Sequence, residues 1–192
     1  MTAMKSVSRQ ALQAPFLVGE RVALRALTEA DCDGPYADWF NDAEVCRYNS
    51  HHVFPHRVED ARSYVARVAE SKTALVLAIT AKSDKRHIGN IALQEIDWVS
   101  RSASLAIIIG ETDCWGKGYA TEACRLLLTH GFKALNLHRI SCGTSERNAP
   151  MQRLATSLGM TLEGRRRQAL FKNGQFVDMV EYGLLRSEFA PS

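Results

Sequence analysis

The chain has 192 residues, of which 46% are hydrophobic and 23% charged, and its formal net charge is +3. This composition is typical of a soluble globular protein with one substantial core. No apolar run approaches the roughly 18 residues that a membrane helix needs, and the charge is too mild to indicate nucleic-acid binding. The five cysteines are scattered, with no C-x-x-C pair, so we expect no disulfide framework and no metal site. A reduced, cytoplasmic setting fits best.

The first half of the chain predicts one helix start, one full helix and four strands. Residues 1–15 have no apolar stretch long enough for a secretory leader, and we expect a disordered tail there, followed by a single domain over residues 16–189. Hydrophobic alternation predicts a strand over 18–27, and a capping-box-like sequence at Thr28 predicts a helix start. Further patterns predict a helix over 58–71 and strands over 74–81, 88–98 and 102–109.

The second half begins with a glycine-rich turn after the apolar strand that ends at Ile109. A long helix follows, because its apolar positions recur on one face: Ala120, Ala123, Cys124, Leu127, Leu128, Gly131, Phe132 and Leu135. A strand over 137–144 and a short helix over 151–158 come next, and Asn173-Gly174 predicts a type I′ hairpin turn between strands 161–171 and 176–185. The whole pattern predicts an α+β fold.

The glycine turn has the features of an anion site. A strand leads through glycines into a helix N-terminus, whose unpaired N–H groups and positive dipole end attract phosphate. A nucleotide-binding P-loop is excluded, because five residues separate Gly110 from Gly116 and Gly118 stands where Ser or Thr is needed. A dinucleotide-binding fingerprint is excluded as well, because Thr121 occupies the place of its third glycine.

The sequence WGKGYA at 115–120 instead resembles the acetyl-CoA pyrophosphate loop, Q/R-x-x-G-x-G/A, of the GNAT N-acetyltransferases. The resemblance extends from Arg21 to Phe189 and is closest to the RimJ/RimL-like branch, which acetylates ribosomal-protein N-termini. Its pieces keep their order and spacing along the chain: Arg21–Arg25, Trp39–Asp42, Ile88–Leu93, Trp115–Ala123, Leu135–Arg139, Asn148, Leu158–Gly164 and Asp178.

The resemblance implies a mixed, mostly antiparallel sheet, flanked by helices, whose fourth and fifth strands splay apart around pantetheine. The backbone of Ile107, Ile108 and Ile109 would pair with the pantetheine amides. The N–H groups of the glycine turn and helix start would hold the pyrophosphate: Gly116, Lys117, Gly118, Tyr119 and Ala120. Thr121 borders this loop, and Asn148 would bond the cofactor arm. Trp115 replaces the Gln or Arg of the broad motif, which removes one polar phosphate contact.

Direct acetyl transfer needs a neutral amine, a stabilised oxyanion and a proton for the departing thiolate. Glu95, Asp97 and Glu111 are candidate bases because each lies in or just beyond the strands that flank the expected cleft; Glu111 ranks lower because it can face the turn. Related enzymes often carry Ser or Tyr acids at positions that are Met151 and Ala155 here. Water, solvent or another side chain such as Tyr119 then supplies the proton, or the chain does not catalyse the reaction.

The histidines His51, His52 and His56 lie in a segment that resemblance associates with the acceptor, together with nearby aromatic residues. They form an acceptor wall or pack the N-terminal helices, and their spacing does not favour a metal. The leading hypothesis is therefore an acetyl-CoA-dependent N-acetyltransferase acting on a protein N-terminus or a small amine. The alternative is a non-catalytic acetyl-CoA-binding module. A homodimer is an open possibility.

Overall fold

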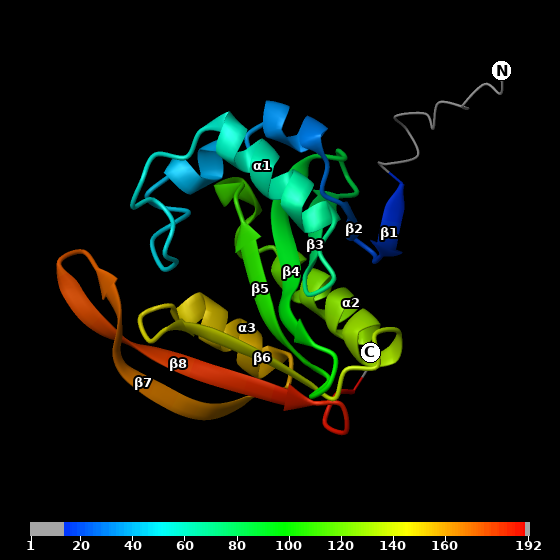
Figure 1. Ribbon diagram of the computed structural model, residues 1–192, viewed down its shortest axis with the longest axis vertical. Helices are drawn as coiled ribbons and strands as arrows, with labels where there is room; N and C mark the ends of the chain where they lie inside the picture. Colours follow the sequence, from blue (N-terminus) through cyan, green and yellow to red (C-terminus); the bar gives the residue numbers. More distant parts are fainter. Residues whose placement is uncertain (1–13, 191–192) are drawn as a thin grey trace, which may run out of the picture.

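An eight-stranded mixed sheet runs through the computed structural model, which describes residues 14–190 (Figure 1). All neighbouring strands are antiparallel except β5 and β6, which are parallel. In spatial order the strands are β1 Pro15–Val18, β2 Val22–Ala26, β3 Leu75–Ala81, β4 His87–Asp97, β5 Ser102–Ile109, β6 Arg139–Ser145, β8 Gln175–Leu185 and β7 Thr161–Lys172.

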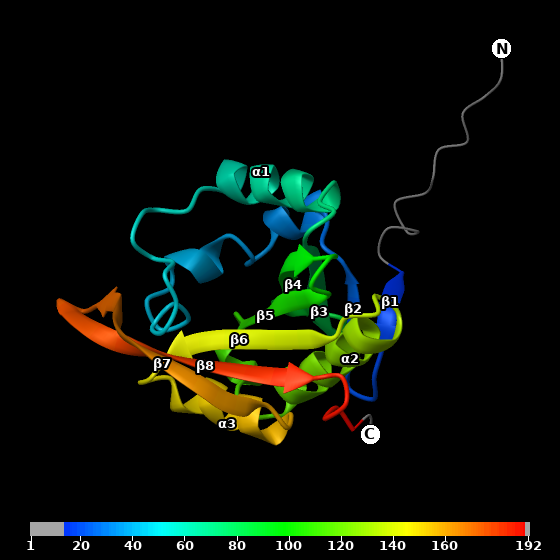
Figure 2. The same ribbon diagram turned by 60° about the horizontal axis from the view of Figure 1, so that its bottom comes forward.

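Helices cover both faces of the sheet (Figure 2). Helix α1, Val58–Ala69, lies on one face above the short 3-10 helices η2, Glu29–Asp33, and η3, Asp38–Asn41. Helices α2, Tyr119–Lys133, and α3, Ala149–Ser157, lie on the other face. A third 3-10 turn, η4 at Thr112–Cys114, connects β5 to α2. The predicted α+β fold is therefore confirmed.

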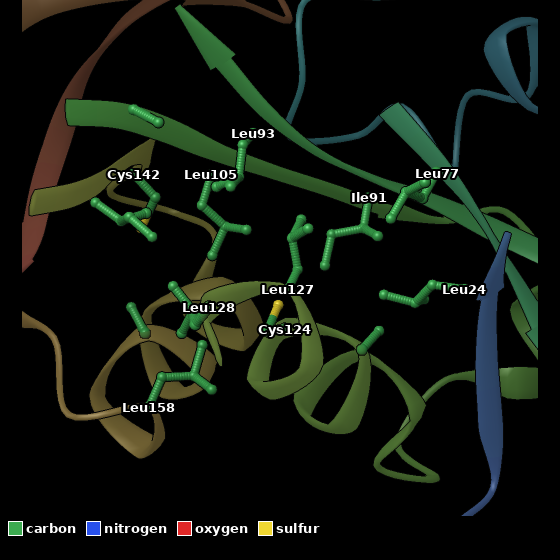
Figure 3. Close-up of a cluster of buried hydrophobic side chains, with 14 of the residues drawn as sticks. Leu24, Leu77, Ile91, Leu93, Leu105, Cys124, Leu127, Leu128, Cys142 and Leu158 are labelled. Carbon is green, nitrogen blue, oxygen red and sulfur yellow. The ribbon is translucent and has the colours of Figure 1, made fainter. Parts of the chain in front are cut away.

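The main core lies between the sheet and α2. Leu24, Ile91 and Leu93 point from the strands toward Cys124 and Leu127 of the helix (Figure 3). Burying one such leucine contributes roughly 1.5–3 kcal/mol to stability. The apolar stripe predicted for the helix is the stripe that packs on the sheet, and its buried members are Ala123, Cys124, Leu127, Leu128, Gly131 and Phe132.

Two of the predicted elements near the N-terminus are different in the structure. The strand expected over 18–27 is present as β2 but begins only at Val22, because the N–H of Gly19 bonds the carbonyl of Val22 at 2.9 Å and closes a tight turn between β1 and β2. The helix expected after Thr28 is only the two 3-10 helices, since Gly34 and Pro35 interrupt it. Residues 1–13 of the predicted tail lie outside the described residues, and Pro15 already belongs to β1.

The C-terminal hairpin is confirmed. Asn173 and Gly174 have φ of 50° and 75°, as a type I′ turn requires, and they connect β7 directly to β8. Helix α3 begins two residues earlier than predicted, with Asn148 as its N-cap. Gly159 follows it with φ of 84°.

The central strands β5 and β6 separate after a short contact. Their parallel pairing covers only Ser102, Ala103 and Ser104 with Arg139, Ile140 and Ser141. Beyond these residues the two strands diverge (Figure 1), while β4 stays paired with β5 as far as Ile109. The predicted splay is therefore confirmed; the strands are the fifth and sixth here because the turn at Gly19 adds one strand at the N-terminus.

Candidate active site

The glycine turn, residues 115–120, presents a row of unpaired backbone donors. Gly116 and Gly118 have φ of 71° and 81°, and Gly118 is the N-cap of α2. Within residues 14–190, no backbone or side-chain acceptor bonds the N–H groups from Gly116 to Thr121. Because the positive end of α2 adds to these donors, the turn can bind an anion the size of a pyrophosphate.

Arg21 holds the glycine turn from the direction of β2. Its guanidinium donates to the carbonyl of Lys117 at 2.8 Å and to the carboxylate of Glu122 at 3.2 Å. Glu122 also accepts from the backbone N–H groups of Arg21 and Val22, at 2.9 and 3.3 Å. Burial opposes ionisation of Glu122, yet these hydrogen bonds and the Arg21 charge lower its pKa. The turn is therefore fixed before any ligand arrives.

Trp115 makes a contact within the protein at the position where the Gln or Arg of the broad motif would contact phosphate. Its indole N–H donates to the carbonyl of Ile109 at 2.8 Å. This bond joins the end of β5 to the start of the glycine turn. The two parts of the predicted cofactor site are thus held at a fixed distance from each other.

The pairing of β4 and β5 determines which backbone groups of β5 face the opening between β5 and β6. The N–H of Gly110 bonds the carbonyl of Ile88, so every second residue of β5, including Ile108, faces β4. The N–H and C=O groups of Ile107 and Ile109 therefore point toward β6, from which β5 has separated. Since Trp115 already occupies the carbonyl of Ile109, the groups left for an extended ligand are both those of Ile107 and the N–H of Ile109.

Asn148 serves as a cap inside the fold. Its Oδ1 accepts from the N–H of Met151 at 3.2 Å, and its Nδ2 donates to Thr144 Oγ1 at 3.0 Å. One lone pair and one N–H of the amide are left for a cofactor arm.

A cavity of ≈ 490 Å³ lies on the α1 side of the sheet, opposite α2, and we refer to it as the α1-side cavity. Its size falls within the range of small-molecule sites. Its floor is formed by β4 and β5, where Asn90, Ala92, Gln94, Ala106, Ile107 and Ile108 contribute. Its walls come from η2–η3, the following loop and α1, through Tyr36, Phe40, Asn49, His51, His56, Asp60, Tyr64 and Arg67.

Two of the three histidines singled out in the sequence lie on this wall. The rings of His51 and His56 pack against Phe40, with centroids 4.7 and 5.1 Å away, whereas His52 is absent from the lining. Burial, together with the nearby His56 and Lys172, lowers the pKa of His51. Asp60 is the one carboxylate among the described lining residues, and its hydrogen bonds from Arg57 lower its pKa to about 2.

The three carboxylates considered as bases lie in two places. Glu95 is exposed at a β-bulge near the far end of β4. Asp97, at that same end, accepts from the hydroxyl and N–H of Ser100 and from the N–H of Val99, and these bonds lower its pKa. Glu111 follows β5 at the splayed end, where it accepts from Trp39 Nε1 at 2.9 Å and from Arg86 at 3.3 Å.

The two positions at which related enzymes often carry a Ser or Tyr acid, Met151 and Ala155 here, lie on α3. Ala155 is fully buried in the core, and Met151 is partly buried against it. Tyr119, the first residue of α2, packs partly buried against the same core.

Asn90 and Gln94 were not among the site residues predicted from the sequence. Both are amides in a strand that is otherwise mostly apolar, and their spacing of four puts them on one face. Tyr36 and Tyr64 come from other elements and join them only through the fold. Two amides at even spacing inside an otherwise buried strand were the sequence signal that could have predicted a polar site here.

Comparison with known proteins identifies the family. Residues 21–161 match the Acetyltransferase (GNAT) domain, so the chain belongs to the GNAT acetyltransferases and is an acyltransferase enzyme. It is 30% identical over 177 residues to the uncharacterized N-acetyltransferase p20 of Bacillus licheniformis, covering 91% of this chain and 98% of that one.

Solved structures share the fold. Spermidine N-acetyltransferase from Vibrio cholerae, in complex with CoA and spermine, superposes with a TM-score of 0.80 at 24% identity, covering 88% of this chain and 97% of that one. Mycobacterium smegmatis RimJ, in complex with CoA-disulfide, gives a TM-score of 0.78 at 21% identity, covering 87% and 83%.

Two negative observations apply to residues 14–190. No group of three or more His, Cys, Asp or Glu side chains in this range is arranged to hold a metal ion. Within the same range, every helix is too short or too polar to cross a membrane.

Proposed function

We propose that the protein transfers the acetyl group of acetyl-CoA directly to a primary amine. The observation that carries this proposal is the row of unpaired N–H groups from Gly116 to Ala120 at the start of α2. This row lies beside the separation of β5 and β6, and the α1-side cavity lies on the other face of the same strand. Acetyl-CoA bound on one face of the sheet and an amine bound in the α1-side cavity on the other face would therefore meet at β5.

The residues fit acetyl-CoA along its length. The glycine turn would bind the pyrophosphate through its backbone donors. Ile107 and the N–H of Ile109 would pair with the pantetheine amides as an added strand. Asn148 would contribute its remaining amide N–H or lone pair, and Trp115 and Thr121 would border the bound phosphates.

The chemistry is one acyl transfer. The amine loses a proton, its nitrogen attacks the thioester carbonyl, the C–N bond forms, and the C–S bond breaks. A backbone N–H of β5 would stabilise the oxyanion. The thiolate takes its proton from water or from Tyr119, because Met151 and Ala155 have no proton to give. A thiolate leaves readily, so a missing dedicated acid slows the reaction without preventing it.

For the base we favour Glu111 over Glu95 and Asp97. Its position at the splayed end of β5 supports this choice, whereas the other two carboxylates belong to the opposite end of the β4–β5 pair. Trp39 and Arg86 orient the Glu111 carboxylate, and a bridging water would connect it to the ammonium.

We also propose that the chain belongs near the RimJ/RimL-like branch. The ordered sequence motifs support this, and so does the likeness to RimJ in fold. The relatives include enzymes named for spermidine as well as for ribosomal proteins. The acceptor is therefore either a protein N-terminus or a small amine.

The test measures free thiol released from acetyl-CoA in the presence of a peptide, an alkylamine, an amino sugar and spermidine. Acceptor-dependent release with a matching acetylated product supports transfer and excludes the binding-only alternative. Tight acetyl-CoA binding without release for any acceptor would reject the proposal and favour that alternative.

A further inference from the structure

A chain of buried polar groups leads from β2 to the floor of the α1-side cavity. Arg25 binds Asp31 through two hydrogen bonds of 2.9 and 2.6 Å. Asp31 Oδ1 lies 3.3 Å from Nδ1 of His87, and His87 Nε2 lies 2.7 Å from Oδ1 of Asn90. The side chains of Arg25, Asp31 and His87 are 12%, 7% and 9% exposed, so these contacts are shielded from water.

Acceptor atoms lie beside both ring nitrogens of His87. Nδ1 faces a carboxylate oxygen, and Nε2 faces the carbonyl of Gly89 at 3.0 Å as well as the amide of Asn90. A carboxylate and a backbone carbonyl can only accept hydrogen bonds, so both ring nitrogens of His87 lie beside acceptor atoms. Hydrogen bonds, chiefly from Arg25, hold the pKa of Asp31 far below its usual range despite burial, so Asp31 stays ionised.

This arrangement fixes the orientation of the side-chain amide of Asn90. Asn90 turns its Oδ1 toward Nε2 of His87, and its side chain also shares a hydrogen bond with the Tyr36 hydroxyl, so one N–H of the amide is left for a ligand. Asn90 is opposite Ile108 in the sheet and lines the α1-side cavity. Tyr36, on the same wall, is buried, and burial strongly raises the pKa of its phenol, which stays protonated. The cavity floor therefore offers hydrogen-bond donors beside β5.

We infer that Asn90 is a specificity-determining donor for a carbonyl next to the accepting amine, and that His87 is the positioning residue that holds it. This inference rests on the proposed function. An acceptor with an aminoacyl group, such as a peptide N-terminus, supplies that carbonyl. A polyamine supplies only cations and offers no acceptor to the remaining N–H of Asn90, and the one carboxylate among the described lining residues, Asp60, is already bound to Arg57.

The experiment compares thiol release with three acceptors: a short peptide with a free N-terminus, a primary alkylamine of similar size and spermidine. Asn90→Leu should raise the KM for the peptide about 10- to 100-fold and leave the KM for acetyl-CoA within about twofold, because one buried hydrogen bond is lost. The alkylamine should change little. Asn90→Asp should shift the preference toward spermidine, since it replaces a donor by a carboxylate.

The role of His87 is tested by His87→Phe, which keeps an aromatic ring against Tyr36 and Trp39 but has no N–H. It should raise the peptide KM as Asn90→Leu does, and the double variant should be no worse than either single one. His87→Gln, which retains an N–H donor, should restore most of the loss. His138→Leu, at an exposed position outside the cavity, is the matched control.

If a folded Asn90→Leu protein still releases thiol and its KM for the peptide is unchanged, the inference is overturned. Additive effects of the two substitutions would overturn the positioning role. If His87→Phe fails to fold, Asn90→Leu and Asn90→Asp still test the role of Asn90 as a donor. The positioning role of His87 is then tested by comparing His87→Gln with the wild type. A rise in the peptide KM of His87→Gln equal to that of Asn90→Leu would reject the positioning role. Failure of the proposed function has a different signature, because the wild type would then release no thiol with any acceptor.

Discussion

Gly116 and Gly118 share a left-handed backbone but have different surroundings. A Cβ on Gly116 would meet no heavy atom within 4 Å, whereas one on Gly118 would lie 2.9 Å from the Arg21 guanidinium. The first residue therefore needs glycine only for its φ angle. The second needs it also because Arg21 must reach the carbonyl of Lys117.

We expect Gly116→Ala and Gly118→Ala each to lower the unfolding free energy by about 1–2 kcal/mol, the cost of a left-handed alanine. Gly118→Ala should in addition raise the KM for acetyl-CoA several-fold more than Gly116→Ala, because it displaces Arg21 from the turn. Urea denaturation and initial rates measure the two effects. Equal KM values for both variants would contradict the role assigned to Arg21.

At Glu111, replacement by Gln should lower kcat about 100-fold if this carboxylate accepts the amine proton. The KM for acetyl-CoA should stay close to that of the wild type. Asp97→Asn is the control, because that carboxylate bonds only its own turn, and it should leave kcat unchanged. A Glu111→Gln enzyme with full kcat would point to water as the sole base.

One carboxylate makes the polar contacts between α2 and the start of β2. Glu122 is 16% exposed and accepts from two backbone N–H groups and from Arg21. Its pKa is lower in the folded protein than in the unfolded chain. The stabilisation is therefore present above about pH 4.3, the unfolded value, and disappears as the pH falls through the folded pKa.

Glu122→Gln should accordingly cost about 1–2 kcal/mol at pH 7, because hydrogen bonds to a charged group are replaced by weaker neutral ones. The difference from wild type should shrink steadily below about pH 4.3. Thermal unfolding at several pH values measures it. Glu44→Gln, which removes an exposed ion pair with Arg47, should show almost no difference at any pH.

Elements with a strong local pattern were predictable from the sequence. The stripe of α2, the Asn173-Gly174 turn and the glycine turn each depend on residues close together in the chain. The strand expected over 18–27 was too long at its start, because the alternation continued across a turn that Gly19 closes through a backbone bond. The α1-side cavity was only partly predictable: Phe40, His51 and His56 came from one segment, but Asn90 and Tyr64 meet them through tertiary packing alone.

On the scale of the whole molecule, three residue pairs of β5 and β6 connect two parts of the sheet. A ligand that bonds β5 and the start of α2 on one side and Asn148, just beyond β6, on the other would strengthen this connection. At 100 times its dissociation constant, acetyl-CoA should add about 2.7 kcal/mol of stability and raise Tm by about 5–10 °C. Acetyl-pantetheine, which lacks the pyrophosphate, should give a much smaller shift at the same concentration. Equal shifts would contradict the assignment of the glycine turn.

The separation of β5 from β6 also affects how the protein behaves at high concentration. Unpaired N–H and C=O groups at Ile107 form a strand edge in the middle of a sheet, a place where most folds have none. Such edges can pair with strands of other chains and start aggregation. An enzyme of this design would therefore be protected by its own substrate: as long as CoA or acetyl-CoA filled the opening, the edge would be closed to other polypeptides.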